Sequence, residues 1–399
     1  MSSTGAIAAH AETATAPAAQ SDTASTAQTV QAKVDALLAQ SGWSAAQQDR
    51  IRGLVANLPA DIDTRLAAAT ASLKEPGATQ YSDIANSVIN PGDYQCSSTP
   101  VRDWLLGQLQ GANPIALLIL ALIAGDQLPI YDALLFGVEG PSNQFGVDGS
   151  YTHPLTSEMK DLRRFWDIDG SAIQLVPMKS DTYSSVDRMA RIYQALGFDA
   201  ATAQALADII PQVFAVDPVL QNGRNPYFTF NSFAFDPTGE PEPLGSLPKK
   251  VIMGDGIMQA YGALGDTTVA PRAILAHEYG HQVQYADNLF VSDLPPGAEQ
   301  TRRTELMADA LGTYFTVHSR GEALNAARTL ADQQTFYNVG DCGFTSAGHH
   351  GTPLQRQRSA TWATSVVDAA PNQGHILPSL QFATLFDQQL PMLVAPDAH

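Results

Sequence analysis

Two histidines with a glutamate between them form the pattern His277-Glu278-x-x-His281 in this 399-residue chain. Side chains four residues apart lie on the same face of a helix, so both imidazoles can reach one metal ion. Zinc favours such nitrogen ligands, at about 2.0–2.1 Å, and a catalytic zinc also takes a third protein ligand and a water molecule. Glu278 stands where it can take the proton from that water.

Chance is a poor explanation of this pattern. With nine histidines and 40 acidic residues in the chain, composition alone would produce a histidine, an acid and a second histidine at this spacing roughly 0.02 times. The alternative is a helix whose two histidines bind no metal. The sequence therefore predicts a zinc site on His277 and His281.

The third ligand has two candidate positions. In one pattern a glycine stands three residues after the second histidine and the third ligand stands six residues after it. Here these two positions hold Gln284 and Asp287. Without that glycine we expect the helix to continue and to point Asp287 away from the metal. In the other pattern a second helix supplies a glutamate, and Glu305 lies 24 residues after His281. We favour Glu305, with Asp309 one turn later orienting a ligand histidine through its other ring nitrogen.

Three segments occur in the order LAHEYGHQVQ, TELMADALGTYF and HGTPLQRQRSATWA. Together they resemble the motifs of a bacterial family of neutral zinc metallopeptidases, over roughly residues 225–370. The resemblance implies a zincin fold, zinc bound by the two histidines of the first motif and the glutamate of the second, and peptide or protein substrates. Gln282 stands where such proteins often carry a further histidine.

A peptidase also needs a donor for the oxyanion that forms on the attacked carbonyl. The candidates are His349 and His350, with Tyr314 and Tyr337 behind them. His350 matches the histidine of the third motif and is preferred as the catalytic donor. The alternative is that a histidine here caps the helix expected to begin near Pro353.

Two arginines in the third motif have a structural interpretation. Arg356 and Arg358 are expected to form ion pairs with acids such as Asp309 or Asp341 rather than to bind substrate. By analogy with zincins, the strand at residues 251–253 is expected to be the sheet edge to which an extended peptide adds.

The elements that position these residues follow from periodicity. Apolar stripes predict early helices, one of them begun by a capping box at Ser44 and Gln47. Alternating phenylalanines predict a strand within residues 226–235, with a one-residue phase slip. The remaining elements expected are helices at 30–38, 62–73, 114–124, 185–196, 270–285, 302–315 and 353–370 and a short strand within 249–256.

This order of elements predicts an α+β fold that is mostly α. We divide it into a disordered Ala/Ser/Thr-rich segment (residues 1–28), a helical N-terminal region (29–220) and a zincin-like catalytic domain with a small sheet (221–399).

Composition excludes some function classes. The formal charge of −18 disfavours sequence-independent binding to nucleic acids, which requires clustered lysine and arginine. It also disfavours anionic membrane surfaces. The longest apolar run, residues 115–124, is shorter than the roughly 20 residues that span a bilayer, so no integral membrane segment is expected.

The two cysteines, Cys96 and Cys342, stand in loop-like settings far apart in the sequence. We favour a disulfide, which suits a secreted or periplasmic protein, although two separate thiols also fit the sequence. The function predicted is zinc-dependent hydrolysis of peptide bonds with Glu278 as general base. The alternative from another class is a non-catalytic zinc-binding protein that keeps the metal helix.

Overall fold

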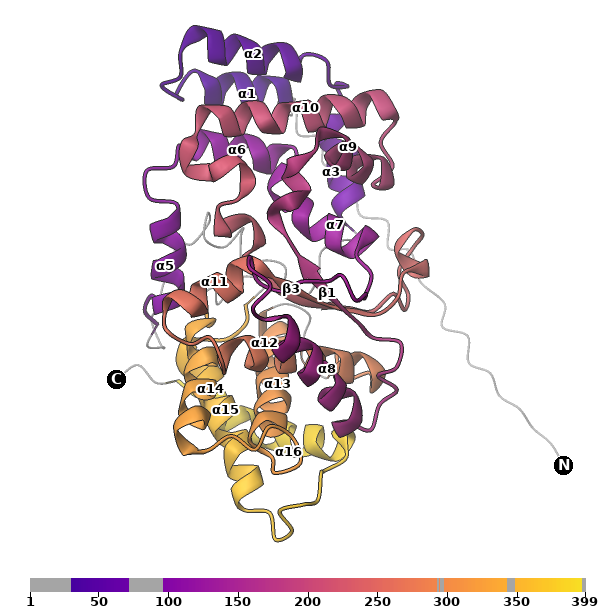
Figure 1. Cartoon of the computed structure of the whole chain (residues 1–399), viewed down its shortest axis with the longest axis vertical. Helices are drawn as coiled ribbons and strands as arrows, with labels where there is room; N and C mark the ends of the chain where they lie inside the picture. Colours follow the sequence, from indigo (N-terminus) through magenta and orange to yellow (C-terminus); the bar gives the residue numbers. More distant parts are fainter. Residues whose placement is uncertain (1–29, 72–95, 293, 295–297, 343–348, 397–399) are drawn as a thin grey trace, which may run out of the picture.

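The computed structural model describes residues 30–71, 96–292, 294, 298–342 and 349–396. The protein is mostly helical, and one three-stranded sheet lies between two groups of helices (Figure 1). This confirms the predicted α+β class, mostly α. The segment predicted to be disordered, residues 1–28, lies outside the described residues.

The first group of helices precedes most of the sheet in sequence and lies above it in Figure 1. Two predicted helix starts are confirmed there. Ser44 and Gln47 form a capping box, and Pro114 occupies the first turn of a helix capped by Asn113. The group comprises α1 (Val30–Leu38), α2 (Ala45–Val55), α3 (Ile62–Ala71), α6 (Pro114–Leu122), α7 (Leu128–Phe136), α9 (Val186–Ala195) and α10 (Ala200–Val216). The predicted end of the third helix, beyond residue 71, lies outside the described part of the chain.

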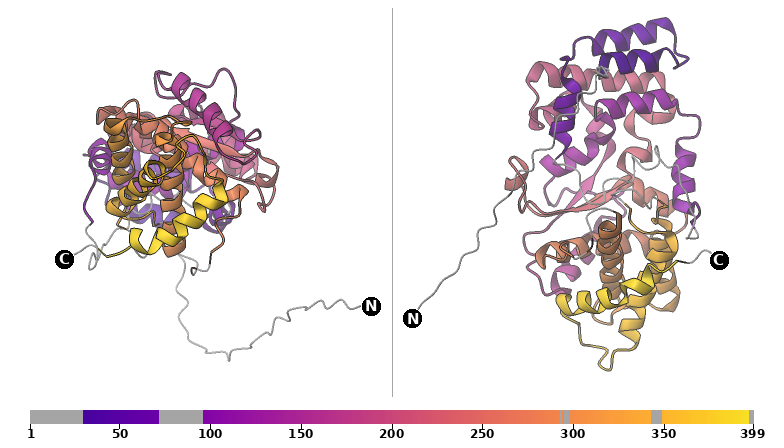
Figure 2. Two further views of the ribbon diagram at one scale, coloured as in Figure 1. Left: turned by 90° about the horizontal axis from the view of Figure 1, so that it is seen from below. Right: turned by 180° about the vertical axis from the view of Figure 1, so that it is seen from behind.

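The second group of helices lies on the other side of the sheet, as the view from behind in Figure 2 also shows. The three helices predicted at 270–285, 302–315 and 353–370 are confirmed within it. Its members are α8 (Thr152–Phe165), α12 (Ala270–Ala286), α13 (Ala298–Val317), α14 (Ala326–Asn338), α15 (Pro353–Asp368) and α16 (Ser379–Leu393). The aromatic rings of Phe165, Tyr314 and Phe382 pack together and join α8, α13 and α16.

Short elements complete the chain. Helix α11 (Asp255–Ala263) lies beside the sheet, and α5 (Pro100–Gln108) packs against α11 (Figure 1). Five 3-10 turns connect longer elements within the described ranges: η1 (Gly125–Gln127), η2 (Ser180–Ser184), η3 (Pro218–Gly223), η4 (Pro226–Thr229) and η5 (Leu244–Ser246).

The sheet has the strand order β1-β3-β2. Strand β1 (Gln174–Met178) runs parallel to β3 (Lys250–Gly254), and β2 (Ser232–Phe235) runs antiparallel to it. The prediction that residues 251–253 form the sheet edge is therefore wrong, because β3 is paired on both sides. Strand β2 is an edge instead.

The predicted strand at residues 226–235 is also shorter than expected. Only β2 is a strand, and residues 226–229 form the 3-10 turn η4. The side chain of Asn225 accepts a hydrogen bond from the backbone N–H of Tyr227, and Pro226 follows Asn225 in the first position of the turn. A capped turn of this kind competes with extended backbone, which explains the phase slip in the phenylalanine pattern.

A buried lysine ties the central strand to the first group of helices. Lys250, 1% exposed, donates hydrogen bonds to the carbonyl oxygens of Leu134 and Gly137 at 2.5 and 2.7 Å. These carbonyls stand at the C-terminal end of α7, where a cation is favoured by the helix dipole. Burial nevertheless lowers the pKa of Lys250 to about 8.

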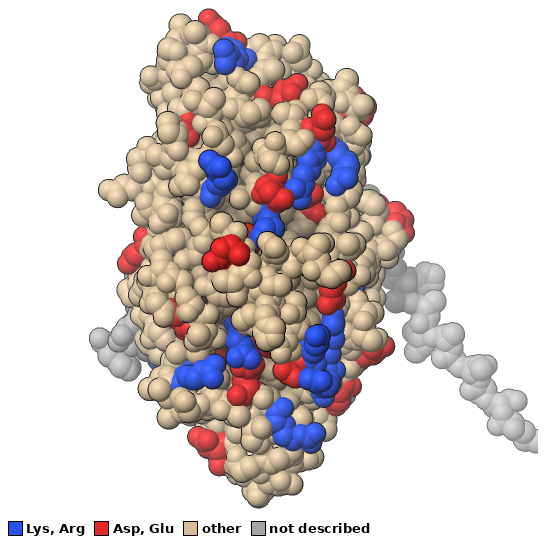
Figure 3. Space-filling view, in the orientation of Figure 1, with Lys and Arg blue, Asp and Glu red and all other residues tan. Residues whose placement is uncertain are grey.

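Among the described residues no single helix is long and apolar enough to cross a membrane, although two bent pairs of consecutive helices reach that length and composition together. On the face seen in Figure 3, lysine and arginine side chains are interspersed with aspartate and glutamate. This face shows no basic patch of the kind that nucleic-acid binding requires.

Candidate metal centre

His277, Glu278 and His281 project from the middle of α12 and are all buried. Their ligand-capable atoms lie within 4.8 Å of one another, and the Nε2 atoms of the two histidines are 3.2 Å apart. The helix is unbroken over Ala270–Ala286, so the four-residue spacing places both imidazoles on one face as predicted. This group could hold a metal ion.

Glu305 reaches the same point from α13. Its carboxylate oxygens lie 3.5 Å from Nε2 of His277 and 3.3 Å from Nε2 of His281. The other candidate ligand, Asp287, is the C-cap residue of α12 and is not among the described residues that line the cavity at the histidines. Of the two predicted third ligands, the structure therefore brings only Glu305 to the histidines.

Two glycines let α12 and α13 approach closely enough for this meeting. A Cβ atom on Gly312 would lie 2.9 Å from the backbone nitrogen of His277. A Cβ atom on Gly280 would lie 3.1 Å from the carbonyl oxygen of Ala308. Side chains at these positions would push the helices apart, so the glycines set the distance between Glu305 and the histidines.

The second ring nitrogen of His277 is held by an acid. Nδ1 of His277 lies 2.8 Å from Asp309 Oδ1. Asp309 in turn accepts hydrogen bonds from Nε and Nη2 of Arg356 at 2.8 and 2.5 Å, which confirms the ion pair expected for Arg356. Burial opposes a charge on His277, but hydrogen bonds to Asp309 and Glu305 outweigh it and raise its pKa to about 10. The surroundings of this imidazole favour positive charge.

The carboxylates at the centre have opposite tendencies. Burial raises the pKa of Glu278, although the two histidines oppose the shift. Burial would also raise the pKa of Glu305, but His350 and His281 hold it well below its usual range. Glu305 is thus suited to remain an anionic ligand, whereas Glu278 is suited to exchange a proton.

A cavity of about 40 Å³ opens onto these groups, enough for a few water molecules. Residues of β2, α12 and α13 line it, together with His350 and Arg356. On the β2 side, Asn231 Nδ2 and Ser232 Oγ are buried without a hydrogen-bond partner among the described residues. Polar atoms in this state are available to a ligand.

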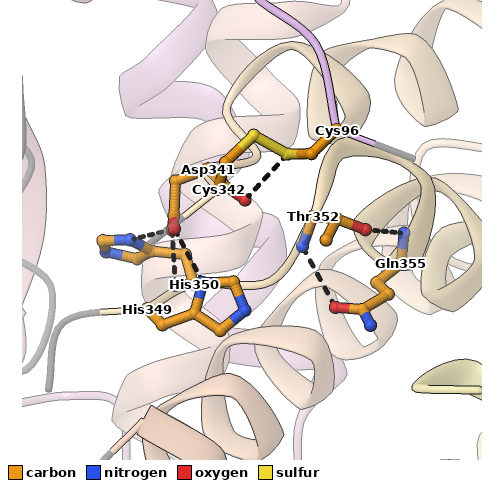
Figure 4. Close-up of a disulfide and its surroundings, with 7 residues drawn as sticks. All are labelled: Cys96, Asp341, Cys342, His349, His350, Thr352 and Gln355. Atoms are coloured by element: carbon orange, nitrogen blue, oxygen red, sulfur yellow. Dashed lines mark hydrogen bonds and ion pairs between the residues drawn. A yellow bond between two sulfur atoms is a disulfide. The ribbon is translucent and has the colours of Figure 1, made fainter. Parts of the chain in front are cut away.

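His350 lines the cavity and is held by Asp341 (Figure 4). Asp341 Oδ2 accepts from the backbone N–H of His350 at 2.6 Å and lies 3.1 Å from its Nδ1. Asp341 Oδ1 lies 2.7 Å from Nδ1 of His349. His349 itself is not among the described residues that line the cavity. Burial would raise the pKa of Asp341, but the two histidines hold it far below its usual range.

The alternative role for these histidines, capping the next helix, is filled by another residue. Thr352 caps α15 and forms a capping box with Gln355 (Figure 4). The two tyrosines proposed behind the histidines are placed elsewhere. Neither Tyr314 nor Tyr337 is among the described residues of the cavity wall, and the Tyr314 hydroxyl accepts from the backbone N–H of Leu377.

The loop that carries Asp341 is covalently anchored. Cys342 forms a disulfide with Cys96, as favoured from the sequence, and Thr99 donates from its hydroxyl to the carbonyl of Asn338 at 2.7 Å. The disulfide is consistent with an oxidising compartment. It fixes the chain next to Asp341 and so helps to place His350 (Figure 4).

Sequence reasoning misses three contributions to the site. It marks Asp341 only as a partner for an arginine. It marks Gln284, whose amide oxygen lies 2.7 Å from Nδ1 of His281, only for the glycine it replaces. It does not mark the pair Asn231 and Ser232 at all. No periodicity or motif identifies them, since the role of each depends on its place in the folded chain. Arg358, expected to pair with an acid, donates to the carbonyl of Ala395.

Comparison of the chain with protein-family models, with curated proteins and with solved structures finds no match. The site is therefore defined by its own geometry: a buried His-Glu-His group on one helix, a glutamate from the next, and a small cavity beside them.

Proposed function

We propose that the protein is a zinc-dependent peptidase with a zincin-like fold, related to the neutral zinc metallopeptidases that its motifs resemble. The observation that carries the proposal is the position of Glu278, which faces the same small cavity as His277, His281 and Glu305. Two imidazoles and one carboxylate form the donor set of catalytic zinc sites that keep a fourth position open for water. In a purely structural zinc site a fourth protein ligand fills that position, and a neighbouring acid has no role in binding the metal.

In this proposal His277, His281 and Glu305 would hold the zinc. When bound, zinc would supply an acidified water and polarise the substrate carbonyl. Glu278 takes the proton of the attacking water and passes it to the leaving amine, a task for which its raised pKa suits it. His350, held by Asp341, donates a hydrogen bond to the oxyanion.

The substrate is an extended peptide that adds to the free side of β2. This strand replaces β3 as the docking edge, because it lines the cavity and has no second neighbour among the described strands. Added strands gain affinity from backbone hydrogen bonds. Asn231 and Ser232 offer further polar atoms at the same place. The disulfide supports a secreted or periplasmic location for this activity.

The proposal is tested with Glu278→Gln. Loss of a positioned general base typically costs 10²–10⁴-fold in rate, so the variant should cleave a denatured protein at least about 100-fold more slowly while it retains zinc. Glu299→Gln is the matched control, since this glutamate is exposed at the start of α13, and it should cleave like wild type. A zinc chelator should abolish cleavage by both the wild type and the control.

Two results would contradict the proposal. Cleavage by zinc-loaded Glu278→Gln at the wild-type rate would remove Glu278 from the mechanism. A wild-type protein that binds zinc stoichiometrically but cleaves no peptide would favour the non-catalytic zinc-binding protein instead.

A further inference from the structure

The two histidines of the centre are oriented by different chemical groups. Nδ1 of His277 faces the carboxylate of Asp309 at 2.8 Å, whereas Nδ1 of His281 faces the side-chain amide oxygen of Gln284 at 2.7 Å. Gln284 is fully buried. A neutral amide therefore does for one imidazole what an anionic carboxylate does for the other.

The same amide also contacts the second helix. Its Nε2 donates to the carbonyl oxygen of Thr304 at 2.7 Å, and Thr304 immediately precedes Glu305. Gln284 thus bridges His281 and the backbone beside Glu305, the two groups that approach from different helices.

This pair of contacts fixes the protonation pattern of His281. A backbone carbonyl can only accept, so the amide nitrogen of Gln284 must face Thr304 and the amide oxygen must face His281. An amide oxygen also only accepts, so Nδ1 of His281 must carry the proton. Nε2 is then left with its lone pair directed at the centre, where a metal ligand needs it.

We propose that Gln284 is a positioning residue of the metal centre, as Asp309 is for the other histidine. It selects the Nδ1–H tautomer of His281 and ties that imidazole to the position of Glu305, and so it strengthens metal binding without contacting the metal. This inference rests on the metal site of the proposed function, and it concerns metal affinity rather than hydrolysis.

The chain offers a matched control on the same helix. Gln282 is 1% exposed and donates to the carbonyl oxygens of Phe235 and Lys250 at 3.0 and 2.8 Å. It therefore also loses two hydrogen bonds on substitution, but these reach the sheet and not the metal centre. Gln284→Met and Gln282→Met should lower the free energy of unfolding of the metal-free protein by similar amounts.

The test is zinc affinity of the full chain, measured by competition with a chromogenic chelator. Loss of a residue that orients a ligand typically costs 10–100-fold in metal affinity. We expect that loss for Gln284→Met and a change of less than about threefold for Gln282→Met. The visible spectrum of the cobalt-substituted protein should change in the first variant and not in the second. Equal zinc affinities in the two variants would overturn the proposal.

A second variant and a wild-type measurement guard against misfolding of Gln284→Met. Gln284→Glu keeps an acceptor for Nδ1 of His281 and should bind zinc more tightly than Gln284→Met. Equally weak zinc binding by the two variants would overturn the proposal.

Histidine-selective ¹⁵N NMR of the zinc-loaded wild type should show the proton of His281 on Nδ1, and a proton on Nε2 would also overturn the proposal. A wild type that fails to bind zinc would overturn this inference and the proposed function together. Unchanged affinity in Gln284→Met with normal wild-type cleavage would overturn this inference alone.

Discussion

At the scale of single residues, the metal centre depends on which acid reaches the two histidines. Glu305→Ala should weaken zinc binding by more than the roughly 10–100-fold that loss of an orienting partner costs, because it removes a ligand itself. Asp287→Ala should leave zinc affinity near the wild-type value, since Asp287 caps α12 away from the cavity. Zinc titration of both variants measures this. The opposite ranking would move the third ligand to Asp287.

The residues that bind or activate could be chosen from the sequence, and so could Asp309, which holds the second ring nitrogen of His277, but the other orienting residues could not. His277, Glu278 and His281 follow from helix geometry, because a four-residue spacing determines their common face. Glu305 could be chosen because the helix had no glycine at which to stop. Gln284 and Asp341 hold their partners through side-chain contacts whose direction no periodicity encodes.

At the scale of elements, the contact between α12 and α13 is set by Gly312. Its added Cβ would lie 2.9 Å from the backbone nitrogen of His277, closer than packed atoms tolerate. Gly312→Ala should therefore force the helices apart, with a loss of about 1–3 kcal/mol in the free energy of unfolding and weaker zinc binding. Urea unfolding and zinc titration of the same samples measure both effects.

Gly107 provides the control for this substitution. It lies in α5, and an added Cβ would meet no atom within 4 Å. Because alanine favours helix over glycine, Gly107→Ala should raise the free energy of unfolding by up to about 1 kcal/mol and leave zinc affinity unchanged. If Gly312→Ala behaved like Gly107→Ala, close approach at Gly312 would not be what places Glu305.

A buried acid between α13 and α14 predicts a pH dependence of stability. Asp332 is fully buried and accepts from the hydroxyls of Thr313 and Thr316, yet burial raises its pKa from 3.8 to about 7. The folded protein therefore binds this proton more tightly than the unfolded chain does. Its contribution to stability is complete below about pH 4, is lost as the pH rises to about 7, and stays lost above that.

Asp332→Asn removes this titration and keeps a hydrogen-bonding side chain of the same shape. The free energy of unfolding of the variant minus that of wild type should rise by a few kcal/mol between pH 4 and pH 8, because each tenfold difference in proton affinity between the folded and the unfolded chain contributes about 1.4 kcal/mol. Chemical unfolding at several pH values measures the difference. A difference independent of pH would show that Asp332 ionises normally in the folded protein.

The sequence predicts where individual elements lie along the chain better than it predicts which elements pack against one another. A short apolar run that follows a turn predicts the strand β3, but it does not predict that β3 is the central strand of the sheet. That place depends on β1, which lies more than 70 residues earlier and pairs with β3 in parallel. Parallel pairing needs a long crossover, and no local pattern reports where such a crossover returns.

At the scale of the whole molecule, the sheet takes strands from both sides of residue 220, the boundary expected between the helical region and the catalytic domain. Strand β1 lies before it, and β2 and β3 lie after it. The pair of Glu158 on α8 with Arg272 on α12 crosses it as well, at 2.8 Å. The expected order of elements changes near this point in the chain, but the packing is continuous across it.

The disulfide also crosses this boundary, and it joins Cys96 to Cys342, which are 246 positions apart in the sequence. Cross-links over long loops restrict the unfolded chain most, and loss of a native disulfide typically costs about 2–5 kcal/mol. Replacing both cysteines by serine should lower the free energy of unfolding by that amount, as measured by urea unfolding.

The same double variant separates the metal centre from the residues that serve the substrate. Its zinc affinity should stay near the wild-type value, because the ligands stand on α12 and α13. Its peptide cleavage should fall, because Asp341 adjoins Cys342 and holds His350 at the cavity. Equal loss of zinc and of cleavage would mean that the disulfide supports the whole centre. Unchanged cleavage would mean that Asp341 keeps His350 in place without the covalent anchor.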